Sequence, residues 1–287
     1  MHNFISRNLK TILVLCALLF VFDAYGTYAF FKPHIGSTDI YFLDVGQGDG
    51  ELIVFPSGGK ILIDAGPANG HAARELGSII SPWDRVIDLA IFTHPEEDHF
   101  GGIFDLYHRI PTSAVLSSGI GKESDGFKKF QEIIAEKNIK EITVAKGDVI
   151  RHGTASMKIM WPEKNMERQS AINDAGIVMM FETEGIRTIF TGDISESVEK
   201  KLMNDIGDVD ILKVSHHGSK YSSTNEFLRV LRPELAFIEV GKNSYGHPTK
   251  EVLERITAVG SRIFRTDMEG TMRVGLYDGK ADVYAFR

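Results

Sequence analysis

After Pro33 the sequence falls into short apolar runs, each bounded by Gly, Asp or Pro, and this pattern restricts the chain to a fold built largely from short strands. The first runs follow one another closely, at residues 39–45, 52–55 and 60–63, which predicts an antiparallel meander. Further strands are predicted at residues 89–93, 114–117, 142–145, 157–161, 177–183, 187–191, 211–214, 235–240 and 262–265, before a closing hairpin.

Segments with helical periodicity alternate with these strands. Their apolar residues recur at the spacing of a helix face, at residues 71–80, 103–108, 127–138, 195–205 and 250–258. A chain that alternates strands and helices packs its helices against sheets. We therefore expect an α/β fold with four layers, an αββα sandwich in which two sheets pack face to face and helices cover them.

The composition fits one large globular domain. Hydrophobic residues make up 43% of the 287 residues and charged residues 25%, which is enough apolar material for a core. The net charge of −7 argues against a surface that coats nucleic acid, but it does not exclude a local basic groove. Cys16 is the only cysteine, so an intrachain disulfide and a cysteine-based zinc site are excluded. Any metal must be held by His and carboxylates.

The N-terminal segment has the features of an export signal. Arg7 and Lys10 precede an apolar stretch at residues 12–22, and apolar and aromatic residues resume at 24–31. Because about 20 residues are needed to cross a bilayer, we interpret residues 1–32 as a signal anchor, an apolar transmembrane helix. Signal cleavage with secretion is the alternative, and a buried soluble helix is another. Either export interpretation places residues 33–287, the expected globular domain, outside the cytoplasm.

A cluster of candidate metal ligands follows the predicted strand at residues 89–93. The sequence Thr-His-Pro-Glu-Glu-Asp-His-Phe-Gly-Gly begins at residue 93 and contains His94, Glu96, Asp98 and His99. Imidazole suits zinc, iron or manganese, and carboxylate suits harder divalent ions, so this mixture is typical of a dinuclear hydrolytic site. A charged surface turn is the alternative interpretation.

This segment resembles the His-x-His-x-Asp-His motif of the metallo-β-lactamase superfamily, with Glu96 in place of the second His. An acidic residue there is similar to the soluble domain of the ComEC/Rec2 family of DNA-uptake channels and its stand-alone relatives. Residues 39–278 carry the resemblance, and none of the channel's membrane spans is present, so we expect the hydrolase part alone. The supporting segments are residues 42–49, 62–66, 191–193, 213–219 and 245–248.

The resemblance implies a site for two divalent metal ions, zinc or manganese. It implies that His94 and Glu96 face one metal, that Asp98 and His99 face the second, and that Asp193 bridges both. For Asp193 the alternative is a helix N-cap, a position that Asp favours. We expect the bridging role.

The remaining ligands are less well defined by the sequence. The superfamily places a third His before the bridging Asp, whereas this chain has Asn173 and Asp174 in that region. His247, after the last long strand, resembles the final metal ligand. Of His216 and His217, one ring is expected in the site and the other in packing or in a hydrogen bond to a ligand, and the sequence does not decide which.

Two further groups of polar residues are candidates for supporting roles. Asp64 lies at a turn and is expected to support the His loop from a second shell, with a purely structural turn as the alternative. Ser219, Lys220, Ser222 and Ser223 follow the double His and would form a cationic lip that suits a phosphate oxygen. A solvated loop is the alternative for these four residues.

The predicted activity is metal-dependent hydrolysis. Asp98 would orient the nucleophile, with Lys220 or His247 near the developing charge. The resemblance implies a phosphodiesterase or nuclease that acts outside the cytoplasm, with single-stranded DNA as a candidate substrate and DNA-uptake machinery as a candidate partner. One alternative is a hydrolase of the same fold that cleaves a lactone, thioester or β-lactam. Another is a non-catalytic module that docks a membrane partner in DNA uptake.

Overall fold

The computed structural model describes residues 13–23, 36–166 and 172–286. The chain divides into two compact units, one of residues 1–37 and one that begins at Thr38 and ends at Arg287. In the smaller unit residues 13–23 form a helix whose apolar side chains are exposed, from Leu13 at 59% to Phe22 at 77%.

The predicted membrane anchor falls only in part on the described residues. Among these residues, no helix combines the length and the apolar character that a bilayer crossing requires. The remainder of the predicted segment 1–32, at residues 1–12 and 24–32, lies outside the described part of the chain. The anchor therefore stays a prediction.

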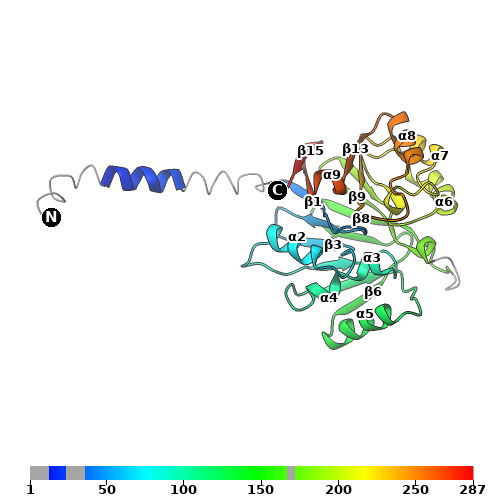
Figure 1. Cartoon of the computed structure of the whole chain (residues 1–287), viewed down its shortest axis with the longest axis horizontal. Helices are drawn as coiled ribbons and strands as arrows, with labels where there is room; N and C mark the ends of the chain where they lie inside the picture. Colours follow the sequence, from blue (N-terminus) through cyan, green and yellow to red (C-terminus); the bar gives the residue numbers. More distant parts are fainter. Residues whose placement is uncertain (1–12, 24–35, 167–171, 287) are drawn as a thin grey trace, which may run out of the picture. The chain divides into compact units, whose positions relative to one another are not determined.

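The first sheet of the larger unit has eight strands among the described residues, in the order β15-β14-β1-β2-β3-β4-β5-β6 (Figure 1). Neighbours from β1 to β3 are antiparallel, which confirms the predicted meander, and neighbours from β3 to β6 are parallel. The strands are β1 (Thr38–Phe42), β2 (Glu51–Val54), β3 (Lys60–Ile63), β4 (Leu89–Ile91), β5 (Ala114–Ser117), β6 (Lys140–Thr143), β14 (Met272–Tyr277) and β15 (Lys280–Ala285).

The second sheet has seven strands within the described ranges, in the order β13-β12-β11-β10-β9-β8-β7. From β10 to β13 neighbours are parallel, and from β7 to β10 they are antiparallel. The strands are β7 (Val149–His152), β8 (Ala155–Trp161), β9 (Val178–Thr183), β10 (Ile186–Phe190), β11 (Ile211–Lys213), β12 (Leu235–Ile238) and β13 (Arg262–Arg265).

Helices cover the outer faces of both sheets, so the predicted αββα sandwich is confirmed (Figure 1). One buried cluster joins the first sheet to α2, α3, α4 and α5, and another joins the second sheet to α6, α7 and α8. The helices are α2 (His71–Ile79), α3 (Glu97–Phe100), α4 (Ile103–Leu106), α5 (Asp125–Glu136), α6 (Glu196–Ile206), α7 (Asn225–Leu231), α8 (Lys250–Ala258) and α9 (Thr266–Glu269), with short 3-10 helices η2 (Asn173–Ala175) and η3 (Ser215–Gly218).

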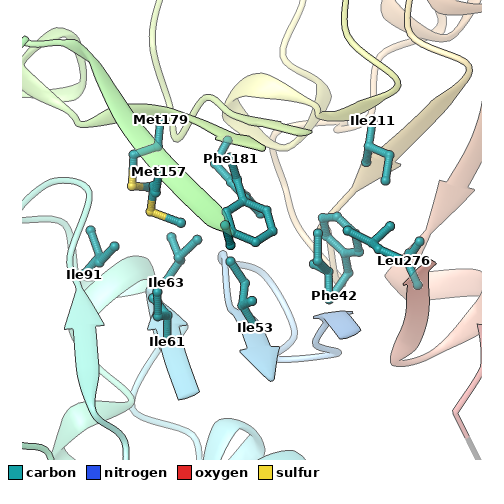
Figure 2. Packing of buried hydrophobic residues seen from close by; sticks show 14 of the residues in the cluster. Phe42, Ile53, Ile61, Ile63, Ile91, Met157, Met179, Phe181, Ile211 and Leu276 are labelled. Carbon is teal, nitrogen blue, oxygen red and sulfur yellow. The ribbon is translucent and has the colours of Figure 1, made fainter. Parts of the chain in front are cut away.

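The main core lies between the two sheets. Figure 2 shows side chains of both sheets facing one another, with Ile53, Ile61 and Ile63 on one side and Met157 and Phe181 on the other. These residues alternate along their strands with residues that face the helices, as expected for strands buried on both faces. Each apolar run of the sequence therefore packs with one face against the other sheet and with the other face against the helices.

The parallel strands place the polar loops at one edge of the sandwich. Asp64 follows β3 and His94 follows β4, while Asp193 follows β10 and the double His begins at His216 after β11. Because the carboxyl ends of neighbouring parallel strands lie at the same edge of a sheet, these loops converge. The fold thus gathers the predicted ligands from both sheets.

Candidate metal centre

One carboxylate oxygen, Oδ2 of Asp193, lies at the centre of four imidazoles. The Nε2 atoms nearest to it belong to His99 at 3.4 Å, His217 at 3.5 Å, His216 at 3.9 Å and His94 at 4.0 Å. These residues come from loops of both sheets, and Asp193, His94, His99 and His217 are buried. This arrangement can present one oxygen and several nitrogens to metal ions.

A second carboxylate completes the cluster on its other side. Asp98, in the first turn of α3, places Oδ2 3.5 Å from Nε2 of His217. Ligand atoms lie within 4.8 Å of one another in four overlapping sets, of which the third and fourth contain Asp49, with Asp193 and His217 and with Asp64 and His99, respectively. The first set is His94, His99 and Asp193, and the second is Asp98, His99 and His217.

The donor atoms fit divalent metal ions. Nε2 of His94, His99 and His217 and Oδ1 of Asp193 are buried and have no hydrogen-bond partner among the described residues. Buried polar atoms normally have partners, because leaving them unsatisfied costs free energy. Imidazole nitrogens and carboxylate oxygens are ligands that zinc and manganese accept. The residues of the cluster therefore suit a metal centre.

The opposite nitrogen of each buried ring is held by the protein. His99 Nδ1 lies 2.7 Å from Oδ2 of Asp64, which also accepts from the Thr93 hydroxyl at 2.6 Å. His217 Nδ1 lies 2.9 Å from the backbone oxygen of Glu239. Donation by Nδ1–H leaves the Nε2 lone pair for a metal and fixes the orientation of each ring. Asp64 thus lies where the sequence predicts a support for the His loop.

The electrostatics favour the metal-binding forms of His94, Asp98 and Asp193. Burial opposes the charge of His99, but Asp193 and Asp64 outweigh it and raise the pKa of His99 well above its usual range. Burial lowers the pKa of His94 to about 3, with the neighbouring His99 adding to the effect, so His94 is neutral at pH 7. Burial raises the pKa of Asp98, but the hydrogen bond to His217 and the charge of His99 outweigh it and set this pKa at about 2. Burial likewise opposes the charge of Asp193, yet His217 and His99 bring its pKa well below the usual range. Both carboxylates are therefore ionised.

Backbone conformation directs the two rings of the double His. Both residues adopt left-handed conformations, with φ of 53° at His216 and at His217. The His217 ring is buried, while the His216 side chain is 33% exposed. The sequence left open which ring enters the site, and the structure brings both within 3.9 Å of Asp193 Oδ2.

The cluster opens into a cavity of about 280 Å³. Its lining includes predicted ligands together with Gln47, Asn173 and Tyr245. Gln47 and Tyr245 are not predicted as site residues, although each lies in a segment that carries the family resemblance. Their amide and hydroxyl groups are able to hydrogen-bond an oxygen-rich substrate.

Comparison with known proteins decides the family. The model of the Metallo-beta-lactamase superfamily matches residues 44–238. The chain belongs to the metallo-β-lactamase superfamily. This result confirms the predicted family, and with it the predicted class of metal-dependent hydrolase.

The curated relatives of this metallo-β-lactamase chain are competence and recombination proteins. ComE operon protein 3 of Bacillus subtilis (strain 168) is 28% identical, over 94% of this chain and 36% of the relative. Recombination protein 2 of Haemophilus influenzae is 27% identical, over 85% of this chain and 30% of the relative. The chain thus spans about a third of the length of these relatives.

Solved structures support the fold alone, because their sequence identities are low. The metallo-beta-lactamase fold protein YhfI from Bacillus subtilis has a TM-score of 0.54 at 12% identity, over 86% of this chain and 99% of that chain. A diphosphatase from the PhnP family has a TM-score of 0.51 at 15% identity, over 84% of this chain and 99% of that chain.

Asn173 and Asp174, which lie in the region where the family resemblance implies a third His, have different tasks. Asn173 lines the cavity. Asp174 instead accepts from the Ser195 backbone at 3.0 Å and from the Ser197 hydroxyl at 3.0 Å, at the start of α6. Ser195, and not Asp193, is the N-cap residue of α6, so the capping alternative for Asp193 does not hold.

Glu96 and His247 line the cavity but stay outside the four ligand sets found in the described residues. The Glu96 carboxylate accepts from Lys122 Nζ at 2.6 Å. The His247 ring centre is 5.8 Å from that of His216. His217, at 3.5 Å, is therefore the imidazole that the structure places beside Asp98.

The predicted cationic lip is not brought to the cavity. The Ser222 hydroxyl donates to the Ile194 backbone oxygen at 2.8 Å, and the Ser223 backbone donates to the Glu199 carboxylate. Lys220 places Nζ 5.1 Å from the ring centre of Tyr221. Because this turn is bound to the start of α6, Ser219, Lys220, Ser222 and Ser223 are absent from the described lining of the cavity.

Proposed function

We propose that the chain is a phosphodiesterase or nuclease that works with two divalent ions, zinc or manganese. The observation that carries this proposal is the single oxygen of Asp193 within 3.4 to 4.0 Å of four imidazole nitrogens. The cavity above it, about 280 Å³, is lined by polar side chains, which suits a phosphodiester better than an apolar ester.

The residues of the chain have separable tasks in this proposal. Divalent ions at such a site acidify water and neutralise charge that develops on phosphoryl oxygens. Asp98, ionised at neutral pH, accepts a hydrogen bond from the nucleophilic water and orients it. Gln47 uses its Oε1 to accept from Gly241 at 3.3 Å, which leaves its amide NH₂ to donate to a phosphoryl oxygen. His247, whose pKa is lowered by burial and by His216, is neutral and lies beside the leaving group.

The names of the relatives support a DNA substrate. Recombination protein 2 and Competence protein ComA of Neisseria gonorrhoeae are named for recombination and competence. We therefore include single-stranded DNA as the proposed substrate and DNA-uptake proteins as the proposed partners. Residues 1–32 are proposed to anchor the domain outside the cytoplasm, which the exposed apolar side chains of helix 13–23 support.

The full chain, purified in detergent, tests the proposal. We expect about two divalent ions per chain by elemental analysis, and cleavage of bis-nitrophenyl phosphate and of single-stranded DNA that a chelator abolishes and added metal restores. Metal content well below one ion per chain would favour the non-catalytic docking module. Cleavage of a β-lactam or thioester without cleavage of either phosphodiester would favour the other hydrolase class.

Glu96 offers a second test, because it is predicted to bind the first metal and yet pairs with Lys122 at 2.6 Å. We expect Glu96→Gln to weaken binding of the first ion by at least about 10-fold, the lower end of the range for partners of metal ligands. Glu96→His should shift the metal preference toward zinc, since imidazole is softer than carboxylate. Titration of each variant with zinc and manganese measures both effects.

Lys122→Met is the matched control for Glu96. It removes the competing cation and leaves the carboxylate in place, so metal binding is expected to be unchanged or tighter. If Glu96→Gln binds both ions as the parent does, Glu96 is only the partner of Lys122 and is not a ligand.

A further inference from the structure

Lys213 is a fully buried lysine beside the candidate metal site, where burial lowers its pKa to about 7 and the charge of Glu239 opposes this shift. It is the last residue of β11, a strand paired with β10 on one side and β12 on the other, and its side chain is 1% exposed. A lysine is almost never fully buried unless it is paired, because removing the ammonium group from water is costly. The groups that contact the Lys213 side chain therefore indicate its role.

The ammonium group of Lys213 contacts the loops of both sheets. It is bonded to the carboxylate of Asp49, which comes from the loop between β1 and β2. It also donates to the backbone oxygen of Gly192 at 3.3 Å and lies 4.0 Å from Oδ1 of Asp193. One cation thus joins the loop of Asp49 to the loop that carries the predicted bridging ligand.

Asp49 also lies close to two of the imidazoles. Its Oδ1 lies 3.1 Å from Nδ1 of His217, and its Oδ2 lies 3.7 Å from Nδ1 of His99. A carboxylate behind a metal-binding imidazole fixes the orientation of the ring and raises its basicity. Lys213 is bonded to Oδ2 of Asp49, and this contact keeps the other oxygen of Asp49 beside His217.

The two oxygens of Asp193 face different surroundings. Oδ2 is the oxygen within 3.4 to 4.0 Å of the imidazoles, whereas Oδ1 lies 4.0 Å from Lys213 Nζ. Lys213 therefore lies on the Oδ1 side of the carboxylate, and the other oxygen faces the imidazoles.

We propose that Lys213 is a positioning residue of the metal centre, which holds Asp49 against His217 and turns one oxygen of Asp193 away from the imidazoles. The inference rests on the proposed metal site. Lys213 touches neither substrate nor ion. Lys213 acts through Asp49 and Asp193. Its place beside Oδ1 accounts for the orientation in which Oδ2 of Asp193 lies close to all four imidazoles.

The test removes both charges of the pair, because removing Lys213 alone would also change the net charge of the site. The double variant Asp49→Asn/Lys213→Met in the full chain keeps the net charge, and neutral replacement of a buried ion pair is often tolerated by the fold. Lys60→Met/Asp84→Asn is the matched control, since Lys60 is buried, pairs with Asp84 at 2.7 Å and lies at the start of β3, away from Asp64. If the first double variant does not fold, Asp49→Asn/Lys213→Gln is used in its place, because Gln keeps a hydrogen-bonding side chain at position 213.

We expect the site variant to bind zinc and manganese about 10- to 100-fold more weakly than the parent, the range for partners of metal ligands. The NMR signal of His217 Nδ1 should also shift in the site variant. The control variant should match the parent in both metal affinity and this signal. A folded site variant with parental metal affinity and a parental His217 signal would overturn the inference and leave the proposed function standing. A parent chain that binds neither ion would overturn the proposed metal site, and this inference with it.

Discussion

Asp193→Ala is expected to lower hydrolysis by more than about 100-fold, beyond the range that partners of metal ligands usually show. Its Oδ2 is the only carboxylate oxygen that the structure places within 4.0 Å of all four imidazoles in the described residues, so no neighbour replaces it. The fold should persist, because the main core lies between the sheets and the cap of α6 is Ser195. Steady-state kinetics at saturating metal and circular dichroism measure the two effects.

Asp174→Asn is the control for this prediction. Asp174 is a carboxylate near the start of the same helix, where it accepts from Ser195 and Ser197. Loss of such a capping contact costs about 0.5 to 2 kcal/mol of stability and should leave metal binding unchanged. Normal turnover of Asp193→Ala at saturating metal would remove the bridging role.

The alternation of apolar runs and helical segments was enough to predict the layers of the fold. Strands that are buried on both faces, such as the run at residues 177–183 that became β9, stand out because each is a continuous apolar stretch. The strand β7 (Val149–His152) has no such signal, since three of its four residues are exposed. Helix α7 (Asn225–Leu231) is too short for its periodicity to repeat.

The candidate site was predictable where its candidate ligands are close in sequence. His94, Asp98 and His99 fall within six residues after a strand, a local pattern that residue chemistry alone marks as a candidate metal site. The choice between His216 and His217 was left open by the sequence, and the left-handed backbone at both residues, which no side-chain pattern announces, accompanies the approach of both rings to Asp193. The bond between Lys213 and Asp49 joins residues 164 positions apart, so only the packing of the two sheets reveals it.

The serine-rich turn shows what composition alone does not indicate. A polar segment beside the double His resembles a phosphate-binding lip, because hydroxyl groups and a lysine suit phosphate oxygens. In the structure Ser222 and Ser223 satisfy the backbone of Ile194 and the carboxylate of Glu199 instead. Burial of the Glu199 carboxylate, which the sequence does not indicate, decided the outcome.

Phe42→Ala is expected to destabilise the larger unit by about 3 to 5 kcal/mol, the usual cost of removing a buried aromatic ring. Phe42 is fully buried between the sheets (Figure 2). Its ring stacks on that of Phe237 from the other sheet, with centres 4.0 Å apart and planes 3° apart. Phe264 continues the stack beyond Phe237 at 5.0 Å. No single neighbour can fill the space, because the sheets themselves would have to move closer together.

Chemical denaturation of the full chain, followed by circular dichroism, measures this loss. Trp83→Ala is the control, since Trp83 is 96% exposed and an exposed side chain away from special features changes stability by about 0.5 kcal/mol or less. Phe42→Leu, which keeps most of the volume, should lose much less than Phe42→Ala. A loss below about 2 kcal/mol for Phe42→Ala would mean that the sheets close over the gap. The ring stack would then not be what holds the two halves of the metal site together, since Phe42 leads into the loop of Asp49 and Phe237 lies beside Lys213 in the sheet.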